Sequence, residues 1–116
     1  MRVVRIIADL TVSDIAATQG FYAEYLGLAR QEIGLDWVTR YVAPSGASLQ
    51  VLTHDAGGPV APVLSVAVED VDAAHEEAVR RGLEIVHPLT TESWGVRRFF
   101  VRDPDGHVLN ILQHRE

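Results

Sequence analysis

The residues that could carry out chemistry in this chain are five histidines and a set of carboxylates, because the sequence contains no cysteine. The lack of thiols excludes disulfides, cysteine nucleophiles and thiolate metal sites. His54, His75, His87, His107 and His114 lie at loop ends, in one helical pattern and in the tail, without the HxH or HxxxH spacing that binds a metal from one element. A histidine metal site is therefore disfavoured.

Acid–base catalysis is the other chemistry open to these residues. A carboxylate and an imidazole such as Asp9 and His54 transfer protons if both reach one substrate, and the sequence leaves that geometry open. No GxSxG elbow, P-loop or GxGxxG motif is present. The run Asp103-Pro104-Asp105-Gly106 contains two carboxylates, but its residue types are those of a tight turn, and we assign it a structural role.

Length and charge limit the partners of the protein. The 116 residues suffice for one domain, with a net charge of −6, and the ten basic residues are all arginines that form no longer cluster than the pairs Arg80-Arg81 and Arg97-Arg98. This charge pattern disfavours nucleic acid as a partner. No apolar stretch approaches the roughly twenty residues of a membrane span. We therefore expect a cytoplasmic protein without a membrane partner.

An internal repeat organises the chain. PSGASLQVL at 44–52 recurs as PDGHVLNIL at 104–112, an offset of 60 residues, and VSDIAA at 12–17 matches VEDVDA at 68–73, an offset of 56. Such self-similarity indicates a duplicated structural unit. We divide the single domain of residues 1–116 into two modules joined at GGPVAP, covering about 1–57 and about 60–116.

Each module predicts the order strand, helix, strand, strand, strand. The expected strands cover 3–12, 29–33, 37–43, 47–53, 63–68, 84–88, 97–102 and 107–113. Ser13 or Asp14 is expected to cap the first helix, which ends at Gly27, and Asp70 to cap the second, at 71–81. A four-stranded sheet with one helix leaves a face uncovered, and two copies can cover each other. The predicted fold is α+β, with two βαβββ modules forming a curved eight-stranded mixed sheet and the helices outside.

Two segments give the chain a family resemblance. VSDIAATQGFYAEYLGL at 12–28 resembles the strand-helix opening of the vicinal oxygen chelate superfamily, and FFVRDPDGHVLNIL at 99–112 is similar to its closing hairpin. This superfamily includes glyoxalase I, extradiol dioxygenases, fosfomycin-resistance enzymes and bleomycin-resistance proteins. The resemblance covers the whole chain. It implies paired modules that form a cleft, usually in a homodimer.

The resemblance also implies four positions that hold a metal in the metal-using members, one on the first and one on the last strand of each module. In this sequence they are occupied by Ile7, Gln50, Val63 and Asn110. A divalent ion requires imidazole, carboxylate or several hard oxygen ligands. Two aliphatic side chains and two amides do not supply them, so we expect no metal and no other cofactor.

The rest of the cleft follows from strand alternation and from the resemblance. If Ile7 points inward, Asp9 does too, and Gln50 brings Leu52 to the same face. Arg98 and Phe100 correspond to ligand-contacting positions of fosfomycin-resistance relatives, and Trp94 lies in a glycine-bearing loop that could close over a ligand or pack on the sheet edge. The expected cleft residues are Ile7, Asp9, Gln50, Leu52, Val63, Trp94, Arg98, Phe100 and Asn110.

Two of these residues carry charge and have alternative interpretations. Arg98 would bind an anionic or carbonyl group, and Asp9 a cation or a hydroxyl; alternatively the two pair with each other or reach solvent. Trp37 and Tyr41 are assigned to the core or a dimer contact in preference to the cleft. A mixed apolar and polar cleft suits a small amphipathic organic molecule.

The leading functional hypothesis is a metal-free, homodimeric protein that binds a small organic molecule, for example to sequester a drug or metabolite. The rival is a glyoxalase-like lyase or isomerase that uses a displaced metal or an acid–base pair such as Asp9 with His54. A third hypothesis is a subunit that only dimerises, with its cleft filled by its own side chains. Whether the modules pair within one chain or across subunits stays open at this point.

Overall fold

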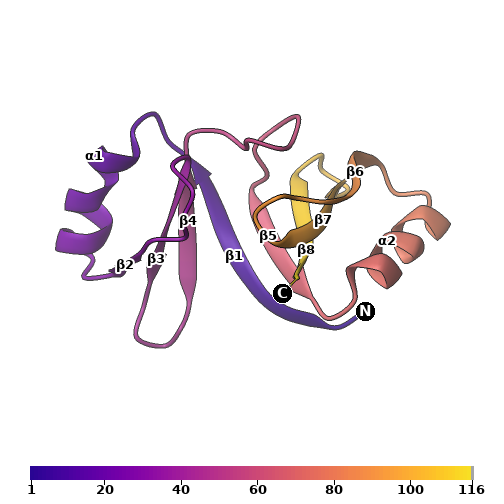
Figure 1. The fold of residues 1–116 in the computed structure, drawn as a ribbon, viewed down its shortest axis with the longest axis horizontal. Helices are drawn as coiled ribbons and strands as arrows, with labels where there is room; N and C mark the ends of the chain where they lie inside the picture. The colour runs from indigo at the N-terminus through magenta and orange to yellow at the C-terminus, as the bar shows by residue number, and fades with distance from the viewer. Residues whose placement is uncertain (116) are drawn as a thin grey trace.

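The computed structural model describes residues 1–115 and contains one eight-stranded mixed sheet that does not close into a barrel (Figure 1). The strands are β1 (Val3–Thr11), β2 (Ala29–Gln31), β3 (Val38–Val42), β4 (Ser48–Leu52), β5 (Leu64–Val68), β6 (Ile85–Thr91), β7 (Val96–Arg102) and β8 (Val108–His114). The helices are α1 (Ile15–Gln19), the π-helical segment η1 (Gly20–Tyr25) that continues it, and α2 (Val71–Arg80). The predicted α+β fold with two βαβββ modules is confirmed.

The two modules pair within one chain. The strand order is β2-β3-β4-β1-β5-β8-β7-β6, and the antiparallel pair β1–β5 joins the modules, with Ile7 opposite Ser65. Figure 1 shows β1 and β5 in the middle of the molecule, α1 at one end and α2 at the other. The structure thereby answers the pairing question that the sequence left open.

Within each module the first and last strands lie side by side and parallel. Asp9 lies opposite Gln50 in the first module, and Ser65 lies opposite Asn110 in the second. Asp9 and Ser65 are 56 residues apart in the sequence, and Gln50 and Asn110 are 60 residues apart. These are the two offsets that define the repeat. Equivalent positions of the two modules therefore come together on either side of the central β1–β5 pair.

The helices begin as the sequence predicts. The carboxylate of Asp14 accepts a hydrogen bond from the backbone of Ala16, and that of Asp70 accepts one from Ala73. These contacts satisfy backbone N–H groups that have no partner inside the helix. After the second helix the backbone of Gly82 adopts a φ of +69°, a conformation that glycine reaches without a Cβ clash. No helix in residues 1–115 is long and apolar enough to cross a membrane.

The core differs between the modules. In the second module α2 lies on the sheet and buries its apolar stripe against β5, β7 and β8; this cluster consists of Val66, Val68, Val71, Ala74, Ala78, Phe99, Val101 and Ile111. In the first module α1 and η1 bury no side chain. Phe21 is 54% exposed and Tyr25 is 75% exposed, and their rings lie 5.4 Å apart. The first module therefore presents apolar surface that this chain does not cover.

One strand is longer than the sequence predicts. β6 runs through Pro88 to Thr91, whereas the expected strand ended at Pro88. Proline interrupts a ladder because it has no N–H, but it is tolerated on edge strands. β6 is one of the two edge strands of this sheet, and its pairing with β7 shifts register on both sides of His87. The strand therefore continues past the proline through these irregular steps.

Candidate functional site

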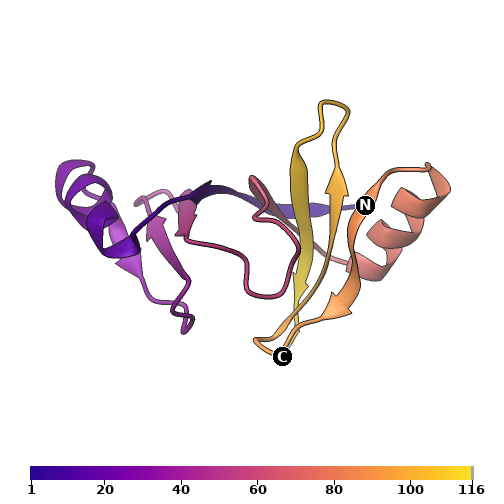
Figure 2. The ribbon, with the colours of Figure 1, turned by 90° about the horizontal axis from the view of Figure 1, so that it is seen from above.

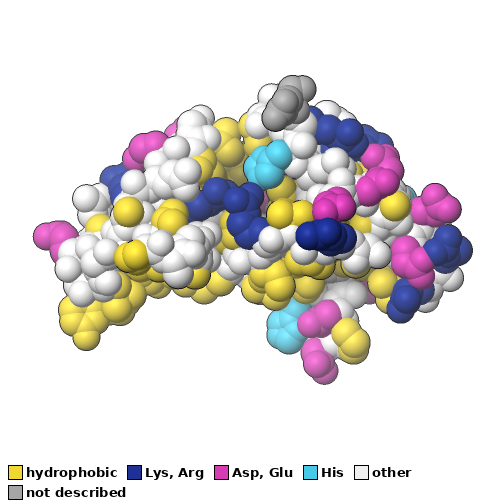
Figure 3. All heavy atoms as spheres, turned by 90° about the horizontal axis from the view of Figure 1, so that it is seen from below, with side chains coloured by type: hydrophobic (Ala, Val, Ile, Leu, Met, Phe, Trp, Pro, Cys, Tyr) yellow, Lys and Arg dark blue, Asp and Glu magenta, His cyan; other side chains and the backbone are white. Residues whose placement is uncertain are grey.

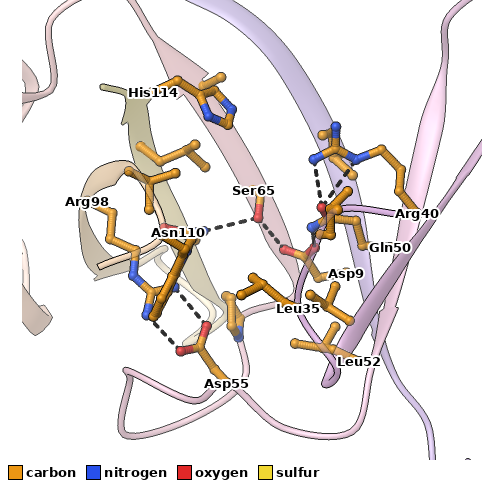
Figure 4. Close-up of a pocket in the computed structure, with 18 of the residues that line it drawn as sticks. Asp9, Leu35, Arg40, Gln50, Leu52, Asp55, Ser65, Arg98, Asn110 and His114 are labelled. Carbon is orange, nitrogen blue, oxygen red and sulfur yellow. Dashed lines mark hydrogen bonds and ion pairs between the residues drawn. The ribbon is translucent and has the colours of Figure 1, made fainter. Parts of the chain in front are cut away.

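A pocket of about 200 Å³ lies between the two modules and is bounded by both halves of the sheet (Figure 4). Its apolar lining consists of Ile7, Ile33, Leu35, Trp37, Val38, Leu52, Pro62, Ala67, Trp94, Val96 and Leu112. Its polar lining consists of Arg5, Asp9, Arg40, Gln50, Asp55, Ser65, Arg98, Asn110 and His114. Apolar walls with a small number of placed polar groups are typical of sites for small molecules.

The centre of the pocket is a hydrogen-bonded chain of polar side chains built on the ladder positions described above. Gln50 Nε2 donates to Asp9 Oδ1 at 2.8 Å, and Ser65 Oγ donates to Asp9 Oδ2 at 2.6 Å. Asn110 Nδ2 donates to Ser65 Oγ at 3.2 Å, and the Arg40 guanidinium donates to Gln50 Oε1 at 2.8 Å. The donors run inward from both sides and end on the Asp9 carboxylate, as the dashed lines of Figure 4 show.

The direction of these hydrogen bonds, toward Asp9, leaves one buried side-chain atom without a partner. The single proton of Ser65 is used on Asp9, so Asn110 must donate to Ser65 through its amide nitrogen. Asn110 is 8% exposed, and its Oδ1 is the buried side-chain atom that lacks a hydrogen bond within residues 1–115. A buried acceptor without a donor is unfavourable by about 1–3 kcal/mol. Because Asn110 lines the pocket, a bound molecule with a donor group can satisfy this atom.

Asp9 is a buried carboxylate with a perturbed acidity. Burial raises the pKa of Asp9, and the charge of Asp55 adds to the rise. The hydrogen bonds from Ser65 and Gln50 and the charge of Arg40 lower this pKa but do not cancel the effect of burial. The carboxylate is therefore less acidic than an exposed aspartate.

Two arginines and a histidine form a basic group at one side of the pocket. Arg5 donates to His114 Nε2 at 3.2 Å, and this nitrogen must be unprotonated because arginine has no acceptor. Burial and the charges of Arg5 and Arg40 lower the pKa of His114. Burial and the charge of Arg5 lower the pKa of Arg40, and Asp9 opposes this. His114 is therefore neutral near pH 7, and the two guanidinium groups repel each other.

A second charged cluster surrounds Arg98. Its guanidinium bonds both carboxylate oxygens of Asp55, at 2.7 and 2.8 Å, and Glu92 Oε2 at 2.7 Å. Burial alone would lower the pKa of Arg98, but the hydrogen bonds and charges of these two carboxylates raise it overall. The guanidinium also lies 5.1 Å from the Trp94 ring centre and 4.8 Å from that of Phe100. The Arg98 side chain is therefore fully engaged in contacts with carboxylates and aromatic rings of its own chain.

This cluster holds the segment between β4 and β5 against the second module. Asp55 accepts hydrogen bonds from the backbone N–H groups of Gly57 and Gly58, while it binds Arg98. A Cβ on Gly58 would lie 2.6 Å from the Phe100 ring, so the backbone can approach this ring as closely as it does only because residue 58 is a glycine. Figure 2 shows the segment looping between the two modules. It forms one wall of the pocket through Asp55 and Pro62.

The structure brings most of the predicted cleft residues together. The pocket lining includes Ile7, Asp9, Gln50, Leu52, Trp94, Arg98 and Asn110. Val63 does not line it: this side chain precedes β5 and is 43% exposed, and Ser65 occupies the corresponding place on the pocket wall. Phe100 is also outside the lining and completely buried, because Gly58 covers its ring. Of the nine expected cleft residues, these two therefore lie outside this pocket.

The proposed pairings of charged residues also differ from the structure. Arg98 binds Asp55 and Glu92 in place of Asp9, and neither charged residue reaches solvent. His54 is exposed, bonds Thr53 and lies outside the pocket lining, so Asp9 and His54 do not form an acid–base pair. Tyr41 is fully buried, as expected for a core residue.

Some lining residues were missed by the sequence analysis. His114 follows Asn110 by four positions on β8, so strand alternation could have placed it on the same face as Asn110. The repeat offset of 60 residues could have indicated Arg40, because it matches Phe100, a predicted cleft position. Asp55 had no comparable signal, because it lies in a loop. Trp37, assigned to the core or a dimer contact, lines the pocket with its ring centre 5.6 Å from that of Trp94.

The donor set of the pocket does not fit the metal that the resemblance implies for other members. No group of three or more His, Cys, Asp or Glu side chains suitable for a metal occurs in the described part of the chain. The central chain offers one carboxylate, Asp9, with both oxygens already accepting hydrogen bonds. Its other members are two amides and a hydroxyl, which are weak ligands for zinc, nickel or iron.

Comparison with known proteins agrees with this architecture of paired βαβββ modules around a pocket. The sequence model of the Glyoxalase/Bleomycin resistance protein/Dioxygenase superfamily matches residues 3–111. The chain belongs to this superfamily. No curated protein matches it.

Solved structures with low sequence identity share the fold. A protein described as NAD-dependent benzaldehyde dehydrogenase from Legionella pneumophila has a TM-score of 0.79 at 24% identity, covering 96% of this chain and all of that one. A superfamily member from Vibrio splendidus 12B01 has a TM-score of 0.69 at 16% identity, with 97% and 99% covered. An extradiol ring-cleaving dioxygenase from B. fuscum has a TM-score of 0.68 at 22% identity; 98% of this chain matches 33% of the enzyme.

Replacing Asp9 by asparagine tests its perturbed acidity. An unfolded aspartate titrates near pH 3.9, and the folded pKa is higher, so the stabilising contribution of the protonated form exists below about pH 4 and is lost as the pH rises through the folded pKa. We expect the melting temperature of Asp9→Asn, relative to wild type, to increase between pH 4 and pH 8. The exposed control Asp36→Asn should show no such slope. A difference that is constant with pH would contradict the assignment.

Replacing Asp55 by asparagine tests the cluster around Arg98. The change leaves a buried guanidinium with one carboxylate, and breaking a buried pair destabilises a protein by about 3–5 kcal/mol. Because Glu92 stays, we expect a loss of about 2–3 kcal/mol in the free energy of unfolding, measured by urea denaturation. Asp36→Asn again serves as the control, with a change within about 0.5 kcal/mol. Equal stability of the two variants would refute the structural role of this pair.

Proposed function

We propose that the protein binds a small organic molecule in the pocket between its modules, without a metal. The observation that carries this proposal is the donor set at the pocket centre, in which the single carboxylate is already bonded by Gln50 and Ser65. Metal-assisted proton transfer requires an ion with open positions and a base. A pocket without these ligands but with apolar walls is suited to binding.

The volume of the pocket limits the size of the molecules that can bind in it. About 200 Å³ is below the range of roughly 300–1,000 Å³ that is usual for drug-sized molecules. Trp37 and Trp94 offer aromatic surface, and Leu35 and Leu52 offer aliphatic surface. These features support a small metabolite over a large drug as the molecule that is sequestered.

Proton-transfer catalysis is a second candidate, favoured by one observation. The pKa of Asp9 is raised by burial, and perturbed carboxylates in pockets are frequent in active sites. Both oxygens of Asp9 accept hydrogen bonds within the protein, which weighs against this role. Turnover of methylglyoxal–glutathione adducts or a related carbonyl by wild type, lost in Asp9→Asn, would establish a glyoxalase-like lyase or isomerase instead.

Filling the pocket tests the binding function. A molecule that binds only the folded state stabilises it by about 2.7 kcal/mol at a hundredfold excess over Kd. We expect members of a library of small metabolites to raise the melting temperature of wild type, whereas zinc, nickel and manganese salts do not. The larger side chain of Ala67→Leu occupies pocket volume and should abolish the response; Ala73→Leu, at an exposed position of α2 outside the pocket lining, should keep it. An unchanged response in Ala67→Leu would contradict binding in this pocket.

We further propose that a second copy of the chain covers the exposed apolar face of α1 and η1. Figure 3 shows apolar side chains at the end of the molecule that carries these helices. We expect light scattering to give twice the chain mass of 12.8 kDa. Phe21→Asp should shift the protein to monomer, whereas Val79→Asp on α2, at 56% exposure, should not. A wild-type monomer, or equal effects of the two variants, would refute this interface.

A further inference from the structure

The pairing of arginines with carboxylates points to the class of ligand, on the basis of the binding function proposed above. Within residues 1–115, eight of the ten arginines lie in salt bridges; these are Arg2, Arg30, Arg80, Arg81, Arg97, Arg98, Arg102 and Arg115. Arg5 and Arg40 have no such partner among these contacts, although the chain carries an excess of acidic residues. Both line the pocket.

The two guanidinium groups are fixed by neutral acceptors. Arg5 donates to the unprotonated Nε2 of His114, and Arg40 donates to the amide oxygen of Gln50. These contacts orient the groups without neutralising them, and the charge of Arg5 lowers the pKa of Arg40. Figure 3 shows basic side chains in the hollow between the modules, beside a histidine. Two like charges held close together in a pocket are stabilised by an anion placed between them.

The charge of that anion is limited by Asp9. This carboxylate lies one hydrogen-bonded step from Arg40, through Gln50, and its charge partly compensates that of Arg40. Arg5 and Arg40 together therefore present less than two uncompensated positive charges. A carboxylate with a single negative charge matches this balance better than a phosphate with two, and its planar shape suits the guanidinium fork.

The second polar feature of the ligand is set by Asn110. Its Oδ1 is buried and has no hydrogen-bond partner within residues 1–115, and Asn110 itself lines the pocket, so a bound molecule that reaches this side chain can supply the missing donor. Figure 4 shows Asn110 and Arg40 on opposite sides of the pocket, with Leu35 and Leu52 near Arg40. A ligand that reaches both groups carries an anion at one end and a donor further along an apolar body.

We propose that the pocket binds a small organic monocarboxylate that carries a hydroxyl or amino donor on an aromatic or branched aliphatic body. The carboxylate binds Arg5 and Arg40. The donor binds Asn110 Oδ1, and the body lies against the two tryptophans and the leucines of the pocket wall.

Matched probes test this assignment by calorimetric titration. The acids are 4-hydroxybenzoate, 4-hydroxyphenylacetate and 3-(4-hydroxyphenyl)propionate, which place the hydroxyl at increasing distance from the carboxylate. Each is compared with its uncharged amide and with the acid that lacks the hydroxyl. We expect at least one hydroxy acid to bind about tenfold or more tightly than its amide, and several-fold more tightly than its dehydroxy analogue, because charged and neutral hydrogen bonds differ by this order.

Single-residue variants distinguish direct binding of the carboxylate by Arg5 and Arg40 from the general effect of removing a positive charge. Arg5→Gln and Arg40→Gln should each weaken acid binding about tenfold or more and leave amide binding within about twofold. The control Arg30→Gln removes the same charge from a residue outside the pocket lining and should change neither. Circular dichroism and melting curves confirm that each variant is folded.

The outcomes distinguish this inference from the binding function on which it depends. If amides bind as tightly as acids, or if the pocket arginine variants match Arg30→Gln, the carboxylate assignment is wrong. If no acid binds while neutral library members do, the inference fails and the binding function stands. If no compound of either set binds, both are overturned.

Discussion

The antiparallel pairing of β1 with β5 is the constraint on which the rest of the structure depends. It places Ile7 opposite Ser65 and so fixes how the two modules face each other. Because each first strand also pairs in parallel with the last strand of its module, Asp9, Gln50, Ser65 and Asn110 come together across four neighbouring strands. A register slip of one residue between β1 and β5 would turn the two side chains of one module to the opposite face from those of the other. The pocket is therefore a property of the central register.

Burial of charge follows from the same arrangement and requires internal partners. A buried ion is costly unless it is paired and hydrogen-bonded. The protein meets this requirement in two ways: Arg98 is bonded by Asp55 and Glu92, while Asp9 receives neutral donors from Gln50 and Ser65. The contacts of Arg98 hold the segment between β4 and β5 against the second module. The second arrangement leaves Asp9 with a raised pKa, because neutral donors only partly offset the effect of burial.

The sequence was sufficient for the fold and for most of the polar residues at the pocket centre. The repeat offset of 56 residues relates Asp9 to Ser65 and that of 60 relates Gln50 to Asn110, which is why Gln50 and Asn110 could be placed on the wall. Val63 could not be excluded from the wall, since strand alternation does not show where a strand begins, and β5 begins one residue later. Asp55 lies in an aperiodic loop, and its contact with Arg98 depends on how that loop folds.

The two modules have diverged in the chemistry of equivalent positions while keeping their geometry. Asp9 and Ser65 occupy matching places on β1 and β5, so a carboxylate in one half faces a hydroxyl in the other, and the hydroxyl donates to the carboxylate. Gln50 and Asn110 match in the same way, but the amide oxygen of Gln50 is bonded by Arg40, whereas that of Asn110 is unpartnered. The asymmetry of the pocket thus arises from the neighbouring strands, where Arg40 lies opposite Gln50 on β3 and its repeat equivalent Phe100 lies opposite Asn110 on β7. Arg40 supplies a donor to one half that the other half lacks, and this difference gives the pocket a charged side and an acceptor side.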